Sequence, residues 1–245
     1  MTSCPFIYHY NITTINDNLR YAKAYHDIIE LYKNDKLGDI TSCRLINNIN
    51  TRQEDASELL EIILQELIEN DSKFAYYITM FGCNTREFKY SSCKEGILLR
   101  LPITDNNLQS IIKTGIINFD GPEKGKDYNH RFAKYNFMQI NRFNQDGTKD
   151  ITKIDIPLKI NIDNQTLELL GIILHKGDST NSGHYIAIVK RNNIWYNCDD
   201  ANITEINIVD ALNTNNVKEN AYILLYELVG TPLLGGSKHY KLITK

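Results

Sequence analysis

The residues best placed to do chemistry are a histidine and two aspartates in the C-terminal part of the chain. Residues 184–198 favour a β-hairpin, because two runs rich in β-branched and aromatic residues flank the polar turn Arg191-Asn192-Asn193. A two-residue turn at Arg191-Asn192 would place His184 opposite Asp199, and a three-residue turn would place it opposite Asp200. Directly opposed side chains lie about 5 Å apart at Cβ. The hairpin therefore predicts a His–Asp pair, of the kind that serves as base and orienter beside a nucleophile.

The elements that must position this pair change in type along the chain. Residues 17–33 carry apolar side chains at helical spacing, and Thr51-Arg52-Gln53-Glu54 is a candidate capping box that opens a helix to about Glu69. The expected buried stripe of that helix is Ala56, Leu59, Leu60, Ile63 and Leu67. Strands are expected at 97–103, 136–143, 154–162, 167–175, 184–190, 194–198 and 221–229. Helices followed by strands predict an α+β fold, with a helical part at about 1–75 and a sheet-rich part at about 76–245 of a single domain.

The composition excludes several classes of protein. Charged residues make up 23% of the 245 residues, and the net charge of −3 is spread without a basic stripe, so no nucleic-acid partner is expected. No signal peptide and no membrane span are expected, since long apolar runs are missing from the sequence. An odd number of cysteines at irregular spacing indicates free thiols in a reducing, intracellular and cytoplasmic setting. Frequent Ile and Asn suggest AT-rich coding, as in some viruses and protists.

Five segments, in the same order along the chain, resemble motifs of the ubiquitin-specific protease family. They comprise a polar helix start, a central strand pair, a histidine box, a Trp-to-Asp-Asp stretch and a closing strand. In this sequence they are Arg52–Leu60, Tyr135–Ile160 with Arg142-Phe143 and Ile156-Pro157-Leu158, Leu167–Tyr185 with Ser182-Gly183-His184-Tyr185, Trp195–Asp200, and Ala221–Tyr226. Cys198 stands where the family usually has Phe.

The resemblance implies a papain-like thiol hydrolase that grips ubiquitin and cuts after its C-terminal tail. Its fold would have an N-terminal helical thumb, a C-terminal antiparallel palm and shortened fingers. His184 would be the general base and Asp199 its orienter, while Asp200 would aid the oxyanion or act as substitute orienter.

The early helix and the histidine box would carry the residues that bind the ubiquitin tail. The positions that match the family's tail-binding residues are Gln53, Asp55, Glu58 and Tyr185. Carboxylates suit a tail that carries arginines, because such hydrogen bonds are charge-assisted. The simpler interpretation is that Asp55 and Glu58 are acids of a first helical turn, where the helix dipole favours them, and that Tyr185 only packs there.

The sequence departs from the family at the nucleophile. No Asn-Thr-Cys box is found in the 245 residues, and Cys4 is followed by Pro5, which cannot donate a helical hydrogen bond. Cys4-Pro5-Phe6 resembles the segment that follows the family's cysteine helix, so the box is expected upstream of Met1. The fingers retain Cys93, but a structural zinc needs four ligands, and neither Cys83 nor His130 completes the set. No metal and no other cofactor are therefore expected.

Three functions remain open from the sequence. The first is a domain that recognises ubiquitin or ubiquitinated proteins through the tail but lacks the nucleophile, and so is a pseudoenzyme. The second is an active deubiquitinase that uses a displaced cysteine, with Cys4 the leading candidate. The third is a scaffold that keeps the fold without binding ubiquitin. The sequence sets neither the linkage preference nor the oligomeric state.

Overall fold

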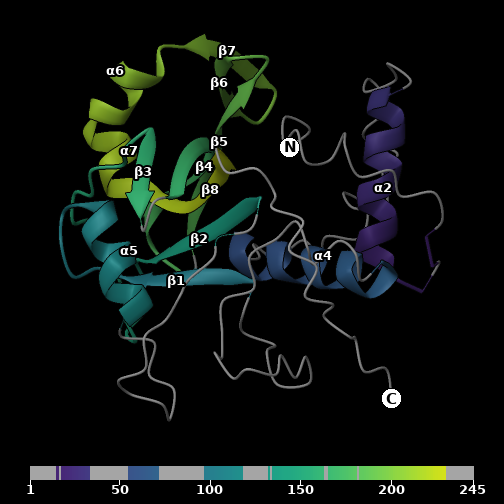
Figure 1. Ribbon diagram of the computed structural model, residues 1–245, viewed down its shortest axis with the longest axis horizontal. Coiled ribbons are helices and arrows are strands. Elements are labelled where there is room, and N and C mark those ends of the chain that lie inside the picture. Colours follow the sequence, from purple (N-terminus) through teal and green to yellow (C-terminus); the bar gives the residue numbers. More distant parts are fainter. Residues whose placement is uncertain are drawn as a thin grey trace.

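The computed structural model describes residues 15–16, 18–33, 55–71, 97–117, 132, 134–162, 165–180 and 182–229. Within these ranges an eight-stranded sheet has the order β1-β2-β8-β4-β5-β6-β7, and β3 pairs with β4 (Figure 1). The strands are β1 (Leu98–Pro102), β2 (Tyr135–Asn141), β3 (Lys159–Ile162), β4 (Gln165–Ser179), β5 (Ser182–Arg191), β6 (Ile194–Asp199), β7 (Asn202–Ile206) and β8 (Ala221–Val229). The helices are α2 (Arg20–Lys33), α4 (Ala56–Asn70), α5 (Leu108–Ile117), α6 (Ile208–Asn213) and α7 (Asn215–Asn220).

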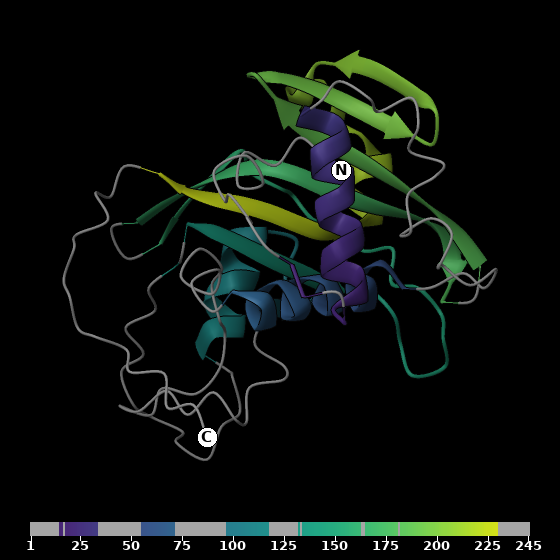
Figure 2. The same cartoon turned by 90° about the vertical axis from the view of Figure 1, so that its right-hand side faces the viewer.

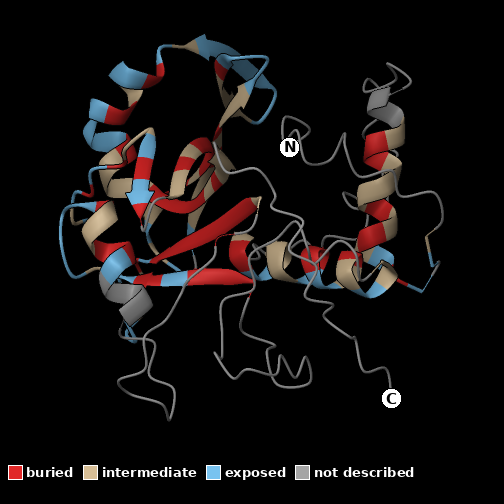
Figure 3. Cartoon of the chain, viewed as in Figure 1, coloured by how far each residue is buried: buried red, intermediate tan, exposed pale blue. Residues whose placement is uncertain are grey.

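The central strands are buried on both faces. Successive side chains of a strand point to opposite faces, and the neighbours Phe137 and Met138 of β2 belong to two different apolar clusters. The Met138 cluster includes residues of α5, α6 and α7, and the Phe137 cluster includes residues of α2 and α4. Figure 3 shows β2 buried along nearly its whole length, whereas β1 alternates between buried and exposed positions after its first two leucines.

The β6–β7 end of the sheet is more open. β7 is exposed along most of its length, and Ile203 is 63% exposed. Figure 2 shows this hairpin at the end of the sheet remote from β1. The β5–β6 hairpin, which carries the predicted His–Asp pair, therefore has buried strands on one side and this open hairpin on the other.

The expected α+β class is confirmed, with several corrections of detail. β1 and β2 are parallel, so the sheet is mixed and not purely antiparallel. The strand expected at 154–162 is confined to Lys159–Ile162. Helices α5, α6 and α7 and strand β7 were not expected, so helix is not confined to the first 70 residues.

The helix expected from Thr51 begins at Ala56, and Asp55 is its N-cap. The Asp55 carboxylate accepts hydrogen bonds from the amides of Ser57 and Glu58 and so satisfies donors that the first turn leaves free. The capping-box prediction was wrong because an aspartate four residues further on fills the same role. Of the expected stripe, Ile63 and Leu67 are fully buried, and Leu59 and Leu60 are partly buried.

Arg142 is a fully buried cation that holds the end of β2 to the start of β8. Its guanidinium donates to four backbone carbonyls, those of Asp150, Thr152, Lys218 and Ala221, at 2.6–3.0 Å. Burial lowers the pKa of Arg142 to about 10, so it remains charged at neutral pH. The bonds fix the loop after β2 against the α7–β8 junction.

Arg142→Met should lower the free energy of unfolding by about 3 kcal/mol, because four carbonyls lose their donor in a buried place. The measurement is urea denaturation. Arg100→Met is the matched control, since the Arg100 side chain is 49% exposed and its ion pair among the described residues is with Glu61, and it should cost less than about 1 kcal/mol. Equal losses in the two variants would contradict the role assigned to Arg142.

Candidate functional site

The β5–β6 hairpin turns at Asn192-Asn193. Both residues have positive φ, 49° and 64°, as the two central residues of a type I′ turn require, and asparagine tolerates this conformation. The flanking pair is Arg191 and Ile194, and the register continues to Ala187 opposite Cys198. The turn therefore lies one residue later than Arg191-Asn192, and the predicted direct opposition of His184 and Asp199 was wrong. One further step of the register places Asp199 across from Ile186.

His184 and Asp199 nevertheless meet. Ile186 and His184 are two residues apart and share a face of the strand, so Asp199 is the diagonal neighbour of His184 and within reach of a long side chain. His184 Nε2 lies 2.5 Å from Asp199 Oδ1, and both side chains are partly exposed. Asp200 Oδ2 lies 4.0 Å from the same nitrogen, with 84% of its side chain exposed. Asp199 is therefore the bonded partner and Asp200 a loose neighbour.

This geometry determines which ring nitrogen is free to react. With Asp199 accepting from Nε2–H, the other nitrogen, Nδ1, carries the lone pair and can take a proton from an incoming group. The carboxylate also stabilises the imidazolium that would form. The pair is thus arranged as a general base with its orienter.

Asp55 connects α4 to the sheet. Oδ1 caps the helix and also accepts from the Ser57 hydroxyl, while Oδ2 accepts from the Tyr222 hydroxyl at 2.7 Å and, more weakly, from the Tyr185 hydroxyl at 3.5 Å. Through Tyr185, Asp55 contacts β5 at the residue that follows His184. Asp55 is thus the N-cap of α4 and not an acid of its first turn, and its carboxylate has additional partners in the sheet.

Tyr222 is a site residue that the sequence did not single out. It is 2% exposed, donates to Asp55 and accepts from Gln139 Nε2 at 2.8 Å. Burial raises the pKa of Tyr222 well above its ordinary range and, together with the nearby Asp55 carboxylate, raises the pKa of Tyr185 to about 12. Both phenols are therefore neutral donors at physiological pH. The sequence did hold a signal for this residue, because Tyr222 lies in the Ala221–Tyr226 segment that resembles the closing strand of the family.

Glu58 differs from Asp55 in its surroundings. Its side chain is exposed on the first turn of α4, and its carboxylate has no hydrogen bond or ion pair within the described residues. Gln53, the remaining residue predicted to bind the ubiquitin tail, lies outside the described residues, as do Cys4, Cys43, Cys83 and Cys93. Cys198 is half-buried on β6 with a free thiol.

The described ranges contain one set of side chains with metal-ligand character, His184, Asp199 and Asp200, whose ligand atoms lie within 4.8 Å of one another. A direct hydrogen bond joins two of them, and an ion would have to replace its proton. The third is largely exposed. The arrangement fits a base and orienter better than a metal centre.

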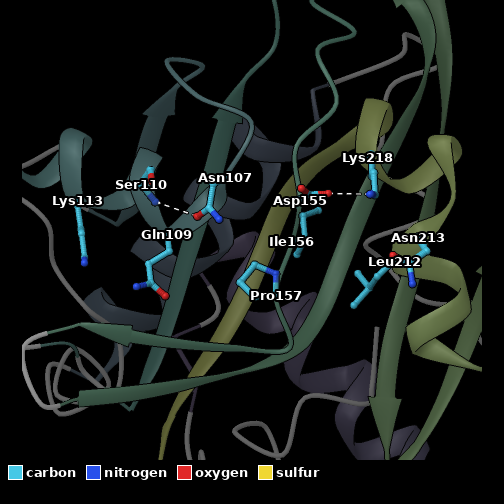
Figure 4. Close-up of a pocket in the computed structure, with 10 residues that line it drawn as sticks. All are labelled: Asn107, Gln109, Ser110, Lys113, Asp155, Ile156, Pro157, Leu212, Asn213 and Lys218. Atoms are coloured by element: carbon cyan, nitrogen blue, oxygen red, sulfur yellow. Dashed lines mark hydrogen bonds and ion pairs between the residues drawn. The ribbon is translucent and has the colours of Figure 1, made fainter.

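A cavity of about 640 Å³ lies away from these residues, between α5, the segment 155–157 and the α6–α7 region. Figure 4 shows Asn107, Gln109, Ser110 and Lys113 on one side and the Asp155–Lys218 ion pair on the other. The ion pair has an N–O distance of 2.7 Å. None of the predicted site residues lines this cavity.

Comparison with known proteins gives the family. The profile described as ubiquitin carboxyl-terminal hydrolase matches residues 7–226, most of the chain. The chain therefore belongs to the ubiquitin carboxyl-terminal hydrolase family, and the resemblance and fold expected from the sequence are confirmed.

Curated relatives match shorter stretches. Ubiquitin carboxyl-terminal hydrolase 3 of Saccharomyces cerevisiae is 41% identical over 71 residues, which are 27% of this chain and 8% of that protein. Ubiquitin carboxyl-terminal hydrolase 4 of Arabidopsis thaliana is 27% identical over 110 residues, 40% of this chain and 30% of that protein. The chain thus matches less than a third of the length of either relative.

Two solved structures share the fold at low sequence identity. The SAGA DUB module with Ubp8 bound to monoubiquitin has a TM-score of 0.63 at 19% identity, covering 94% of this chain and 65% of that one. An essential yeast splicing factor has a TM-score of 0.55 at 14% identity, covering 79% and 54%. The fold therefore occurs in proteins described by different functions, and function must be argued from the site. No helix in the described ranges is long and apolar enough to cross a membrane.

Tyr222→Phe should reduce the free energy of unfolding by about 1–3 kcal/mol, because Asp55 loses its donor and the buried Gln139 amide loses its acceptor. The measurement is chemical denaturation. Tyr185→Phe is the matched control: its hydroxyl reaches Asp55 only at the long distance of 3.5 Å and otherwise meets the Ala56 backbone at the start of α4, so its loss should be below about 1 kcal/mol. A larger loss for Tyr185→Phe would show that Tyr222 is not the main contact between α4 and the sheet.

Proposed function

We propose that this chain recognises ubiquitin through the ubiquitin C-terminal tail, and that its 245 residues do not by themselves hydrolyse ubiquitin conjugates. The observation that carries the proposal is the His184–Asp199 hydrogen bond, on the strand that also brings Tyr185 to Asp55 at the start of α4. In the family, these matched positions lie beside the scissile bond and the tail. A ubiquitin-bound neighbour with the same fold supports the partner.

The charges of the site suit this partner. The exposed Glu58 carboxylate is free within the described residues to accept from an arginine of the tail. Asp55 is held in place by the helix amides and by Tyr222, so it offers a fixed negative charge without a further ordering cost. Electrostatic attraction of this kind contributes to specificity and to the rate of association.

The proposal that these residues do not hydrolyse conjugates rests on the lack of a cysteine in the family's nucleophile motif. None of the five cysteines in the sequence lies in the family's cysteine box. Cys198, the cysteine within the described ranges, is adjacent to Asp199 and therefore points to the opposite face of β6 from the carboxylate that holds His184. Among the described residues, no thiol therefore lies on the face from which His184 Nδ1 would take a proton.

Glu58→Gln should weaken ubiquitin binding about three- to tenfold, since one charge-assisted hydrogen bond is lost. Calorimetric titration with monoubiquitin measures this, and Glu69→Gln is the matched control because Glu69 is exposed at the other end of α4. Ubiquitin that lacks its C-terminal residues should bind weakly to every variant. Equal affinity for full-length and tail-less ubiquitin, or no binding at all, would contradict the proposal.

A second function is favoured by the same hydrogen bond. A domain that only binds has no need of an orienter on His184, so an active deubiquitinase with a displaced thiol, Cys4 foremost, is the alternative. A ubiquitin probe with a C-terminal electrophile separates the two. We expect no covalent labelling; labelling that Cys4→Ala abolishes would establish the alternative in place of the binding function.

A further inference from the structure

A lysine lies directly across the β-ladder from His184. The antiparallel pairing of β4 with β5 is regular from Gly171–Val189 to Lys176–His184, and the register shifts only after Lys176. Directly opposed residues of neighbouring strands share a face of the sheet, and their Cβ atoms lie about 5 Å apart. Lys176 therefore lies on the same face as His184, although the sequence did not single it out as a site residue.

His184 thus has charged neighbours on both sides. Strand β5 lies between β4 and β6 in the sheet. On the β6 side, Asp199 accepts the hydrogen bond from Nε2, and Asp200 lies 4.0 Å from the same nitrogen. On the β4 side, the directly opposed residue is Lys176. The site therefore has a negative side, to which the imidazole is already bonded, and a positive side.

The Lys176 ammonium is not used by the fold. Within the ranges that the structure describes, the half-buried Lys176 side chain has no hydrogen bond or ion pair. Other lysines of the sheet do have partners, since Lys159 pairs with Glu168 and Lys134 with Glu227. An ammonium group has three donors and no acceptor. Its donors at Lys176 are therefore available to a ligand that carries negatively charged oxygens.

We infer that Lys176 binds the terminal carboxylate of the ubiquitin tail, and that this chain therefore binds free ubiquitin in preference to conjugated ubiquitin. The inference rests on the proposed function, because it takes the ubiquitin tail as the ligand and adds which form of the tail is preferred. Free ubiquitin ends in a carboxylate, whereas in a conjugate the same carbon belongs to a neutral amide. A hydrogen bond between an ammonium and a carboxylate is roughly twice as strong as one between neutral groups.

The end of the tail lies within reach of Lys176 if it lies beside His184. The proposed function places the last residue of the tail next to this histidine, where the base of the family acts. The lysine side chain has a flexible four-carbon stem, which spans the distance of about 5 Å between paired Cβ atoms. The ammonium can therefore meet a carboxylate that lies over the His184 ring.

The nearby aspartates make this lysine necessary for binding an anion. Asp199 and Asp200 would both repel a third carboxylate. The charge of Asp199 is partly offset by the hydrogen bond from His184, and the Asp200 side chain is 84% exposed, so that water and salt weaken its repulsion. Lys176 supplies a positive charge on the opposite side of the ring. Without it, the site would carry only negative charges and would favour a neutral group.

The test compares two forms of one ligand by calorimetric titration. The first is ubiquitin with its natural terminal carboxylate, and the second is ubiquitin whose terminal carboxyl group has been converted to the amide. The unmodified chain should bind the carboxylate form about tenfold more tightly. Lys176→Gln should weaken binding of the carboxylate form about tenfold, because a neutral side chain cannot form the charge-assisted bond, and should change binding of the amide form by less than about twofold.

Two further variants separate a local contact from a general effect of charge. Lys190→Gln removes another half-buried lysine that has no partner in the described part of the chain. Lys190 lies six residues from His184 along β5, about 20 Å away, and its loss should leave both affinities unchanged. Lys176→Arg keeps the positive charge and should keep the preference for the carboxylate form. Binding of the amide form shows in each variant that the protein is folded.

Equal affinity of the unmodified chain for the two forms would overturn the inference and leave the binding of ubiquitin intact. Equal losses in Lys176→Gln and Lys190→Gln would also overturn it, because the effect would then come from the overall charge of the protein. If neither form of ubiquitin binds, the proposed function fails, and the inference fails with it.

Discussion

The arrangement of the site depends on the tight turn at Asn192-Asn193. A two-residue turn with both φ values positive matches the natural twist of two antiparallel strands, and it fixes which residues of β5 and β6 share a face. Because the side-chain period of a strand is two, a shift of one residue would move Asp199 to the other face. The observed register keeps Asp199 on the face of His184, one diagonal step away.

The strands of this hairpin are in turn anchored by burial and by a few polar bonds. β4 and β8 are covered on both faces, and this fixes Tyr222 of β8 and, through the pairing of β4 with β5, Tyr185. Asp55 then joins α4 to both tyrosines, and Arg142 fastens the loop and the α7–β8 junction behind them. Buried polar groups with their partners in place favour one arrangement over others. As a result, β4 and β8 form a firmly held part of the sheet, and the more exposed β5–β6 hairpin extends from it.

Much of this could be predicted from the sequence, and the exceptions have physical reasons. Helical periodicity predicted the helix that contains Ile63, and runs of β-branched residues predicted the main strands. These patterns are strong because the elements concerned bury a large part of their side chains. The position of the turn was missed by one residue, although the tolerance of asparagine for positive φ favoured Asn192-Asn193 over Arg191-Asn192. β7 was missed because most of its side chains are exposed and lack alternation. α6 and α7 have only six residues each, too few for a helical pattern.

The site itself was predictable in its parts but not in its connections. His184, Asp199 and Asp55 could be named from local pattern and resemblance. That Asp55 is bonded to Tyr222, or Tyr222 to Gln139, depends on contacts between residues far apart in sequence, which no local pattern reports. Membership of the family indicates a class of reaction. Whether this chain both binds and hydrolyses depends on the residues of its site.

The most direct measurement is a nuclear magnetic resonance titration of the labelled chain with ubiquitin. The central claim requires the shifted amide signals to cluster at the start of α4, near Asp55 and Glu58, and on β5 around His184 and Tyr185. A titration without shifts, or one whose shifts gather at the cavity between α5 and α7, would contradict it.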